Sequence, residues 1–102
     1  MVEVSARDLF AAFEANEVAA KAKYGDQALA VTGVIAGVSL DFMDRPVVSL
    51  ETSNQFMSVD ATFGKEDAEK TAALAKGQTI TVTCSELTEA IGKPLLSDCA
   101  LP

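Results

Sequence analysis

The sequence predicts a mainly β protein with two helices, and three observations lead to that fold class. Apolar residues recur at helical spacing in residues 5–24, and then at every second position from residue 28 onward. Residues 64–77 return to a helical pattern, and two further alternating segments follow them. The chain has 102 residues, of which 49% are hydrophobic, so we expect one domain over residues 1–102.

The first predicted helix covers residues 5–24. Ser5 fits the N-cap, because its side chain can accept a hydrogen bond from the backbone N–H of Asp8. The apolar stripe that follows consists of Leu9, Phe10, Phe13, Ala20 and Tyr24. Asn16 and Glu17 lie on or beside this stripe, and we expect them to bond to the sheet backbone or to lie at the edge of the contact.

Five short strands are predicted within residues 27–101, which form the barrel. The first is "ALAVTGVIAGVSL", whose glycines indicate a strand that bends. After it come the strands "VVSLET" and "FMSVDATF", the helix "GKEDAEKTAALAKG", and the strands "TITVTCSEL" and "PLLSDCAL". This is the order of a five-stranded OB-fold Greek-key barrel, here preceded by an N-terminal helix and with a second helix between strands three and four. An SH3-like barrel is the nearest alternative, but it does not naturally hold a helix at that point.

The last two strands carry the two cysteines, Cys84 and Cys99. If these strands pair as a hairpin with a loop over residues 89–94, Cys84 opposes Cys99 and Val82 opposes Leu101, which puts all four on one apolar face. Opposed residues of this kind have Cα atoms about 4.5 Å apart, within disulfide range. We therefore predict a disulfide, with two reduced core thiols as the alternative. Zinc is not expected, because structural sites need four Cys or His ligands and the chain has no histidine.

The charge of the chain opposes nucleic-acid binding. The net charge is −7, from 15 acidic and 8 basic residues, whereas binding to phosphate backbones depends on Lys and Arg. Binders of single strands also need a basic groove and stacking aromatics. Strands two and three offer Phe56 as their one outward aromatic, and Arg45 is the only basic residue between Lys23 and Lys65. Binding of single-stranded nucleic acid is therefore the least favoured of the functions considered.

An enzyme is not expected, and neither is a cofactor. Without histidine, no Ser-His or Cys-His nucleophile can form. Asp41, Asp44 or Asp60 could serve a paired-carboxylate mechanism, but such residues are more often solvated charges of loops and strands. The glycines of the chain match neither a P-loop nor a dinucleotide-binding pattern.

Two predicted loops carry apolar residues at the usual ligand-binding positions of the OB-fold, the connections between strands one and two and strands four and five. They are "LDFMDRP" and "TEAIGKP", and the candidate partner-binding residues are Phe42, Met43, Arg45 and Ile91. Phe42 can instead fold over the barrel end and plug the core. If the three apolar side chains reach solvent together, they form a patch that is typical of a protein contact or of self-association. Its expected charged rim consists of Asp41, Asp44, Arg45, Glu89 and Lys93.

The segments "LFAAFEANEVAAKAKYGDQALAVTGVI", "LAKGQTITVTCSEL" and "LLSDCAL" resemble the tRNA_anti-like family of bacterial OB-fold proteins, many of which are described as lipoproteins. The resemblance covers nearly the whole chain. It implies an OB barrel preceded by a helix and an envelope location, often with a lipid anchor on the full-length precursor. It implies no catalytic residue.

Two functions agree with these observations. The first is a non-enzymatic OB-fold binding module, the soluble part of a bacterial envelope protein that binds a protein or a small ligand. The predicted disulfide favours it, because such bonds are rare in the cytosol. The second is a small acidic inhibitor of a basic partner protein inside a bacterium or from a phage. The start "MVEVSARDLF" has no secretory signal, which favours a cytoplasmic location unless a leader was removed. No apolar run approaches the roughly 18 residues of a transmembrane segment.

Overall fold

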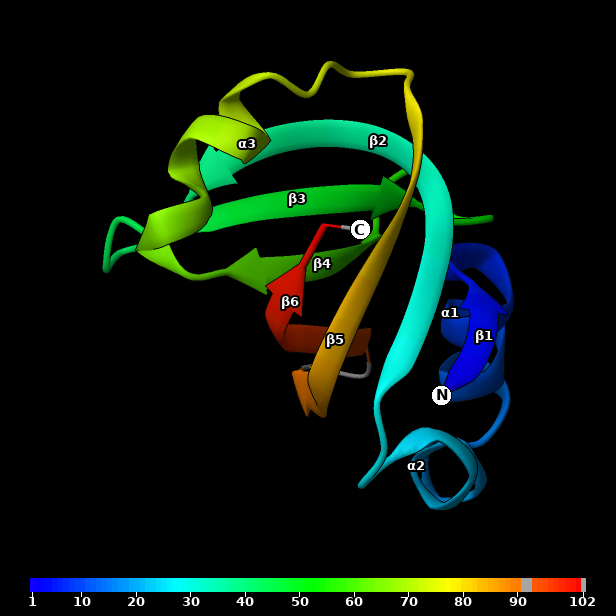
Figure 1. The fold of residues 1–102 in the computed structure, drawn as a ribbon. Helices are drawn as coiled ribbons and strands as arrows, with labels where there is room; N and C mark the ends of the chain where they lie inside the picture. The colour runs from blue at the N-terminus through cyan, green and yellow to red at the C-terminus, as the bar shows by residue number, and fades with distance from the viewer. Residues whose placement is uncertain (91–92, 102) are drawn as a thin grey trace.

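The computed structural model describes residues 1–90 and 93–101. Its elements, in chain order, are β1 (Val2–Ser5), α1 (Ala6–Ala15), α2 (Glu17–Tyr24), β2 (Leu29–Leu40), β3 (Pro46–Glu51), β4 (Ser58–Phe63), the 3₁₀ turn η1 (Lys65–Asp67), α3 (Ala68–Ala72), β5 (Thr79–Ala90) and β6 (Lys93–Ala100). The strands follow the order β1-β2-β3-β4-β6-β5, and β5 pairs again with β2. Strands β2 to β6 therefore close a five-stranded barrel with α3 between its third and fourth strands (Figure 1). The predicted fold class is confirmed.

The short strand β1 is an addition to the expected element order. It runs parallel to the first half of β2, with Val2 opposite Leu29 and Ser5 opposite Thr32. The second half of β2 pairs with β3 on the same side. Four residues give too short an alternation to identify a strand from the sequence, and the parallel pairing exists only because α1 returns the chain to the barrel.

The helix predicted over residues 5–24 is interrupted at Asn16, which has an extended backbone. Its N–H donates to the C=O of Ala12 at 3.0 Å and so ends α1, while its Oδ1 accepts the N–H of Ala19 at 3.1 Å and so begins α2. Both Asn16 and Glu17 are exposed, so the expected bond to the sheet backbone is wrong, whereas the alternative of a place at the edge of the contact agrees with the structure. The predicted N-cap is confirmed, because the Ser5 hydroxyl accepts the N–H of Asp8 at 3.0 Å. The break lets α2 run in a different direction from α1 (Figure 1).

Strand β2 bends, as its glycines predict. Its first half pairs with β5 as far as Val34, and its second half pairs with β3 with a register shift between Ile35 and Gly37. A Cβ added at Gly33 would lie 3.0 Å from the Cβ of Ala6 and 3.2 Å from that of Leu50. Helix α1 and strand β3 therefore approach the backbone of β2 so closely that a side chain there would require these neighbours to shift by a few tenths of an ångström.

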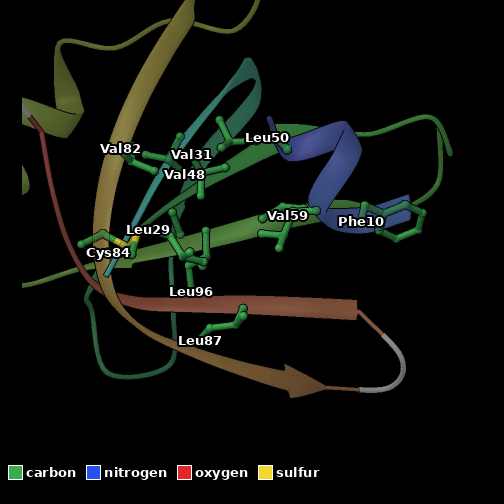
Figure 2. Close-up of a cluster of buried hydrophobic side chains, with 14 of the residues drawn as sticks. Phe10, Leu29, Val31, Val48, Leu50, Val59, Val82, Cys84, Leu87 and Leu96 are labelled. Carbon is green, nitrogen blue, oxygen red and sulfur yellow. A yellow bond between two sulfur atoms is a disulfide. The ribbon is translucent and has the colours of Figure 1, made fainter. Parts of the chain in front are cut away.

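The core consists of the inward residues of the barrel strands together with the buried face of α1 (Figure 2). Its largest fully buried side chains are Phe10, Phe13, Phe63, Leu9, Leu29, Ile35, Leu50, Leu96, Val31, Val48, Val59 and Val82. Each contributes about 1.5–3 kcal/mol of transfer free energy on burial. Burial alternates strictly along β3 and β4. Of the half-buried outward positions, all are polar except Val47 on β3.

The second helix is shorter than predicted. Residues 64–77 were expected to be helical, but α3 ends at Ala72 and the chain then forms a turn in which Gln78 N–H donates to the C=O of Ala75 at 3.1 Å. Gly77 has a φ of 91°, a conformation that glycine adopts without strain. Buried Thr71 bonds through its hydroxyl to the carbonyls of Asp67 and Ala68, each at 3.0 Å.

Candidate binding surface

The turn between β2 and β3, residues 41–45, is held together by the carboxylate of Asp41. Its Oδ1 accepts the backbone N–H groups of Met43 and Arg45 at 2.9 Å each, and its Oδ2 accepts Nε of Arg45 at 2.9 Å. The backbone adds a bond from Asp41 N–H to the C=O of Arg45 at 2.9 Å, and one from Asp44 N–H to the C=O of Asp41 at 3.0 Å. These bonds hold the turn in one shape.

The same bonds set the ionisation of Asp41. The backbone N–H of Arg45 lowers the pKa of this carboxyl below its ordinary value, against partial desolvation, and the N–H of Met43 and the Arg45 side chain act in the same direction. Asp41 therefore stays charged to a lower pH than a free aspartate. Its charge is balanced by Arg45 in an ion pair.

This rigid turn presents apolar side chains to solvent. Phe42 is 94% exposed and Met43 is 51% exposed, and the preceding β2 residues Leu40 and Val38 are 63% and 40% exposed. We call these four residues the apolar strip. The alternative in which Phe42 plugs the core is wrong, because the residue is 94% exposed.

A hollow of ≈ 180 Å³ lies between the apolar strip and α3. Its lining is almost wholly apolar and comprises Val38, Ser39, Leu40, Pro46, Ala68, Thr71 and Ala72. The hollow extends the apolar surface from the end of β2 towards the short helix. An apolar surface of this kind, with charged residues around it, is typical of a protein contact.

The other two predicted partner-binding residues are Arg45 and Ile91. Arg45 is committed to Asp41, although 40% of its side chain remains exposed. Ile91 lies outside the described residues. Of the expected charged rim, Lys93 bonds instead to Asp60 on β4 at 3.2 Å, and Glu89 lines a separate groove beside α2.

The outward face of β4 is polar, as predicted for Ser58, Asp60 and Thr62. Ser58 Oγ donates to Asp60 Oδ1 at 2.7 Å, and Lys93 Nζ donates to Asp60 Oδ2 at 3.2 Å. Phe56 belongs to the turn before β4 and is 87% exposed, so its expected place within the strand is wrong. Arg45 and Lys93, which lie beside this face, are each paired with a carboxylate.

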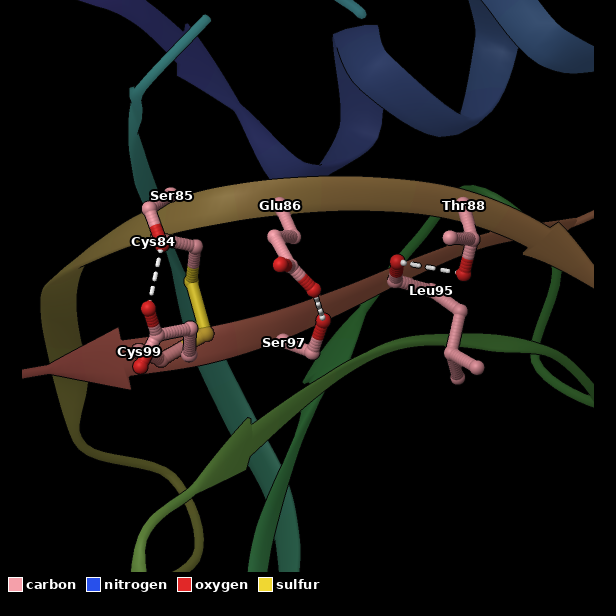
Figure 3. Close-up of a disulfide and its surroundings, with 8 residues drawn as sticks. Cys84, Ser85, Glu86, Thr88, Leu95, Ser97 and Cys99 are labelled. Atoms are coloured by element: carbon pink, nitrogen blue, oxygen red, sulfur yellow. Dashed lines mark hydrogen bonds between the residues drawn. A yellow bond between two sulfur atoms is a disulfide. The ribbon is translucent and has the colours of Figure 1, made fainter. Parts of the chain in front are cut away.

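The last hairpin, β5–β6, has the predicted register and disulfide. Cys84 opposes Cys99, with Sγ atoms 2.06 Å apart and Cα atoms 4.0 Å apart (Figure 3). Both cysteines are buried, and Ser97 Oγ donates to Glu86 Oε2 on the outer side at 3.1 Å. The strands extend to Ala90 and from Lys93, so the loop predicted over residues 89–94 is shorter than expected.

A groove of ≈ 530 Å³, called here the α2 groove, lies between α2 and the end of β5. It was not expected from the sequence. Its floor includes Phe13, and its walls carry Glu17, Lys21 and Glu89. A hydrogen bond to Glu89, and repulsion by its charge, raise the pKa of Glu17. No sequence signal relates these carboxylates, because only the docking of α2 beside β5 brings them together.

Within residues 1–90 and 93–101, no three Cys, Asp or Glu side chains are grouped so as to hold a metal ion. No helix in the same part of the chain has the length and apolar character needed to cross a membrane.

Comparison with known proteins supports the fold. A family model described as tRNA_anti-like matches residues 1–100. A solved structure of a "putative nucleic acid-binding lipoprotein" from Klebsiella pneumoniae superposes with a TM-score of 0.78 at 15% identity, covering 99% of this chain and 92% of that one. A chain of the Stn1–Ten1 complex of S. pombe superposes with a TM-score of 0.55 at 12% identity, covering 74% of this chain and 58% of the other. A search of curated proteins finds no significant match. Identities this low establish the shared fold alone.

Proposed function

This chain belongs to the tRNA_anti-like family, and we propose that it is a non-enzymatic binding module that recognises another protein through its β2–β3 turn. The observation that carries the proposal is the 94% exposure of Phe42 on a turn held by Asp41. Burying a phenylalanine contributes about 1.5–3 kcal/mol. A preformed turn also loses little conformational entropy on binding, so most of that free energy is available for affinity.

A protein partner agrees with the charges better than a nucleic acid does. The chain carries a net charge of −7, and Arg45 and Lys93 beside the polar face are already paired with carboxylates. Single-stranded nucleic acid is the second candidate, because exposed Phe42 and Phe56 could stack on bases. The description of the Klebsiella protein also favours it. Repulsion from phosphates opposes it.

The proposed site of action is the bacterial cell envelope. The Cys84–Cys99 disulfide supports an oxidising compartment, and the lipoprotein description of the Klebsiella neighbour points the same way. A cytoplasmic inhibitor of a basic partner is the alternative, supported by the acidic charge of the chain.

The test is a comparison of Phe42→Ser with Phe56→Ser. Both residues are exposed phenylalanines on turns of the same barrel, so Phe56→Ser controls for the loss of one exposed ring. Immobilised wild-type protein and Phe56→Ser are expected to retain the same partner from a periplasmic extract, and Phe42→Ser is expected to lose it at an unchanged melting midpoint. Equal retention by all three proteins would contradict the proposal.

Fluorescence anisotropy with labelled single-stranded DNA and RNA separates the two candidates. We expect no binding at low salt. Micromolar binding that weakens as salt is added, and that both phenylalanine variants reduce, would favour the nucleic-acid candidate instead.

A further inference from the structure

The α2 groove is separate from the contact proposed at the β2–β3 turn. Helix α2 precedes β2 and the turn follows it, so the two sites lie at opposite ends of this strand (Figure 1). Apart from Phe13 at the floor of the groove, every described residue that lines it is exposed. Solvent therefore reaches the walls of the α2 groove, and a ligand can reach them too.

The break at Asn16 places the helix that forms one wall. Asn16 ends α1 and caps α2, and the second helix then runs in a new direction (Figure 1). Because α2 begins at Glu17, this carboxylate lies at the start of the wall. The opposite wall comes from Thr88 and Glu89 at the end of β5.

The walls of the groove carry more negative than positive charge. Glu17, Asp26 and Glu89 supply carboxylates, whereas Lys21 is the one basic side chain among the described lining residues. The ion pairs within residues 1–90 and 93–101 lie at the β2–β3 turn and on β4. No cation of this part of the chain, Lys21 included, therefore lies within ion-pair distance of the groove carboxylates.

Two of these carboxylates are close neighbours. Glu17 and Glu89 share a hydrogen bond, and this bond together with the charge of Glu89 raises the pKa of Glu17. Once both groups are ionised, they repel each other. A cation placed between them would remove that repulsion and would donate hydrogen bonds to both.

Apolar surface adjoins the carboxylate pair. Val18 follows Glu17 directly and is 82% exposed. Ala22 lies four residues further along α2 and so on the same face of the helix as Val18. Lysine and arginine side chains lay their aliphatic stems along apolar surface while the charged head reaches beyond it. The groove therefore offers one surface for the stem and one for the head.

We propose that the α2 groove binds a lysine or arginine side chain of a basic partner protein, with its head between Glu17 and Glu89 and its stem along Val18. The charge of the groove complements such a side chain, and the net charge of −7 attracts the protein that carries it. The same charge opposes a second copy of this chain and a phosphate backbone. This site goes beyond the proposed function, because it shares no residue with the β2–β3 turn.

Fluorescence anisotropy with a labelled peptide of alternating lysine and alanine tests the site. The matched probe is the same peptide with every lysine acetylated, because acetylation removes the charge and keeps the stem. Wild-type protein is expected to bind the acetylated peptide roughly tenfold more weakly than the lysine peptide. Added salt should weaken binding of the lysine peptide by screening. Equal binding of the two peptides, or binding of neither, overturns the proposal.

A pair of double variants separates the groove from the charge of the whole chain. Glu17→Gln with Glu89→Gln keeps the size of both side chains and should weaken binding of the lysine peptide roughly tenfold. The matched control is Glu14→Gln with Glu69→Gln, which removes the same amount of charge from two exposed positions outside the groove. The control should bind as wild type does. Equal weakening by both double variants would mean general attraction to an acidic protein and would overturn the site.

NMR on wild-type protein gives a reading that needs no variant. The methyl signals of Val18 and Ala22 should shift when the lysine peptide is added, whereas those of Val38 at the far end of β2 should not. Unchanged signals from Val18 and Ala22 would overturn the site.

Spermine distinguishes a free amine from a protein segment, because it carries amino groups without a peptide backbone. We expect it to bind more weakly than the lysine peptide, and equal or tighter binding would overturn the assignment to a protein partner. Phe42→Ser should bind the lysine peptide as wild type does, so failure at the α2 groove and failure at the β2–β3 turn are distinguishable.

Discussion

The β5–β6 hairpin and the far end of β2 are built from the same alternating pattern but end in opposite states. In the hairpin, Cys84, Leu96 and Cys99 are buried, and both strands have neighbours on each side. At the end of β2, Val38 and Leu40 are exposed, and one side of this segment pairs with no strand of the described chain. Alternation thus predicts which residues share a face, whereas burial requires another element on that face. The hairpin supplies stability, and the end of β2 offers contact surface.

The largest expected difference is between two leucines. Leu96→Ala in the hairpin removes a fully buried side chain and should lower the free energy of unfolding by about 2–5 kcal/mol. Leu40→Ala removes one that is 63% exposed and should change it by less than about 0.5 kcal/mol. Urea denaturation measures both. Similar losses for the two variants would mean that the end of β2 is covered in solution.

Removing the disulfide should cost slightly less than the Leu96 change. The bond joins residues 15 apart in the sequence, and in the chain-entropy model a loop of that length contributes about 3 kcal/mol. Reduction, or Cys84→Ala with Cys99→Ala, should therefore lower the denaturation midpoint. Thiol titration of denatured, non-reduced protein should find no free thiol, and two reactive thiols per chain would contradict the pairing.

A smaller effect should appear in acid at the exposed turn. Folding lowers the pKa of Asp41 from an ordinary value of 3.8. The stability it contributes is therefore present above about pH 3.8 and is lost as pH falls through the lower pKa of the folded state. Asp41→Asn should remove that part of the acid dependence, seen as a flatter loss of melting midpoint below pH 4. The control is Asp44→Asn, which keeps the Asp41 bonds, and an equal change in both would argue against the turn geometry.

The smallest effect is a dependence of stability on pH with the opposite sign, and it arises in the α2 groove, where Glu17 lies near Glu89 of β5. Hydrogen bonding to Glu89 raises the pKa of Glu17 above 4.5. Stability from this pair is therefore present below that pH and is lost as pH rises through the higher pKa of the folded state. Glu17→Gln should make the melting midpoint slightly less sensitive to pH just above 4.5. An NMR titration that finds the pKa of Glu17 at or below 4.5 would contradict the contact.

Prediction from the sequence succeeded where a pattern is local. The period-two alternation and the two cysteines predicted the pairing of Cys84 with Cys99, because a one-residue slip would turn Val82 to solvent. The stripe of Leu9, Phe10 and Phe13 predicted the buried face of α1 for a similar reason. It did not predict the break at Asn16, because the stripe continues across it.

The candidate site was only partly predictable. The position of Phe42 between two strands predicted a turn, but not whether the ring would fill the core or reach solvent. Its exposure depends on the Asp41 hydrogen bonds and on a barrel interior already filled by side chains from distant parts of the chain. The contact between Glu17 and Glu89, likewise, exists only because α2 docks beside β5.

The sequence by itself determined the barrel class, the order of its strands, the disulfide and the family, because these depend on residue periods and on the order of segments along the chain. Only the tertiary structure decided the pairing of β1, the exposure of Phe42, the α2 groove and the residue at which the pairing of β2 with β5 ends. Each of these depends on how far two elements overlap once the barrel closes. The side of β2 that faces β5 is paired as far as Ile35 because the turn at Gly77 carries the chain away there, and no alternation of residues encodes that distance.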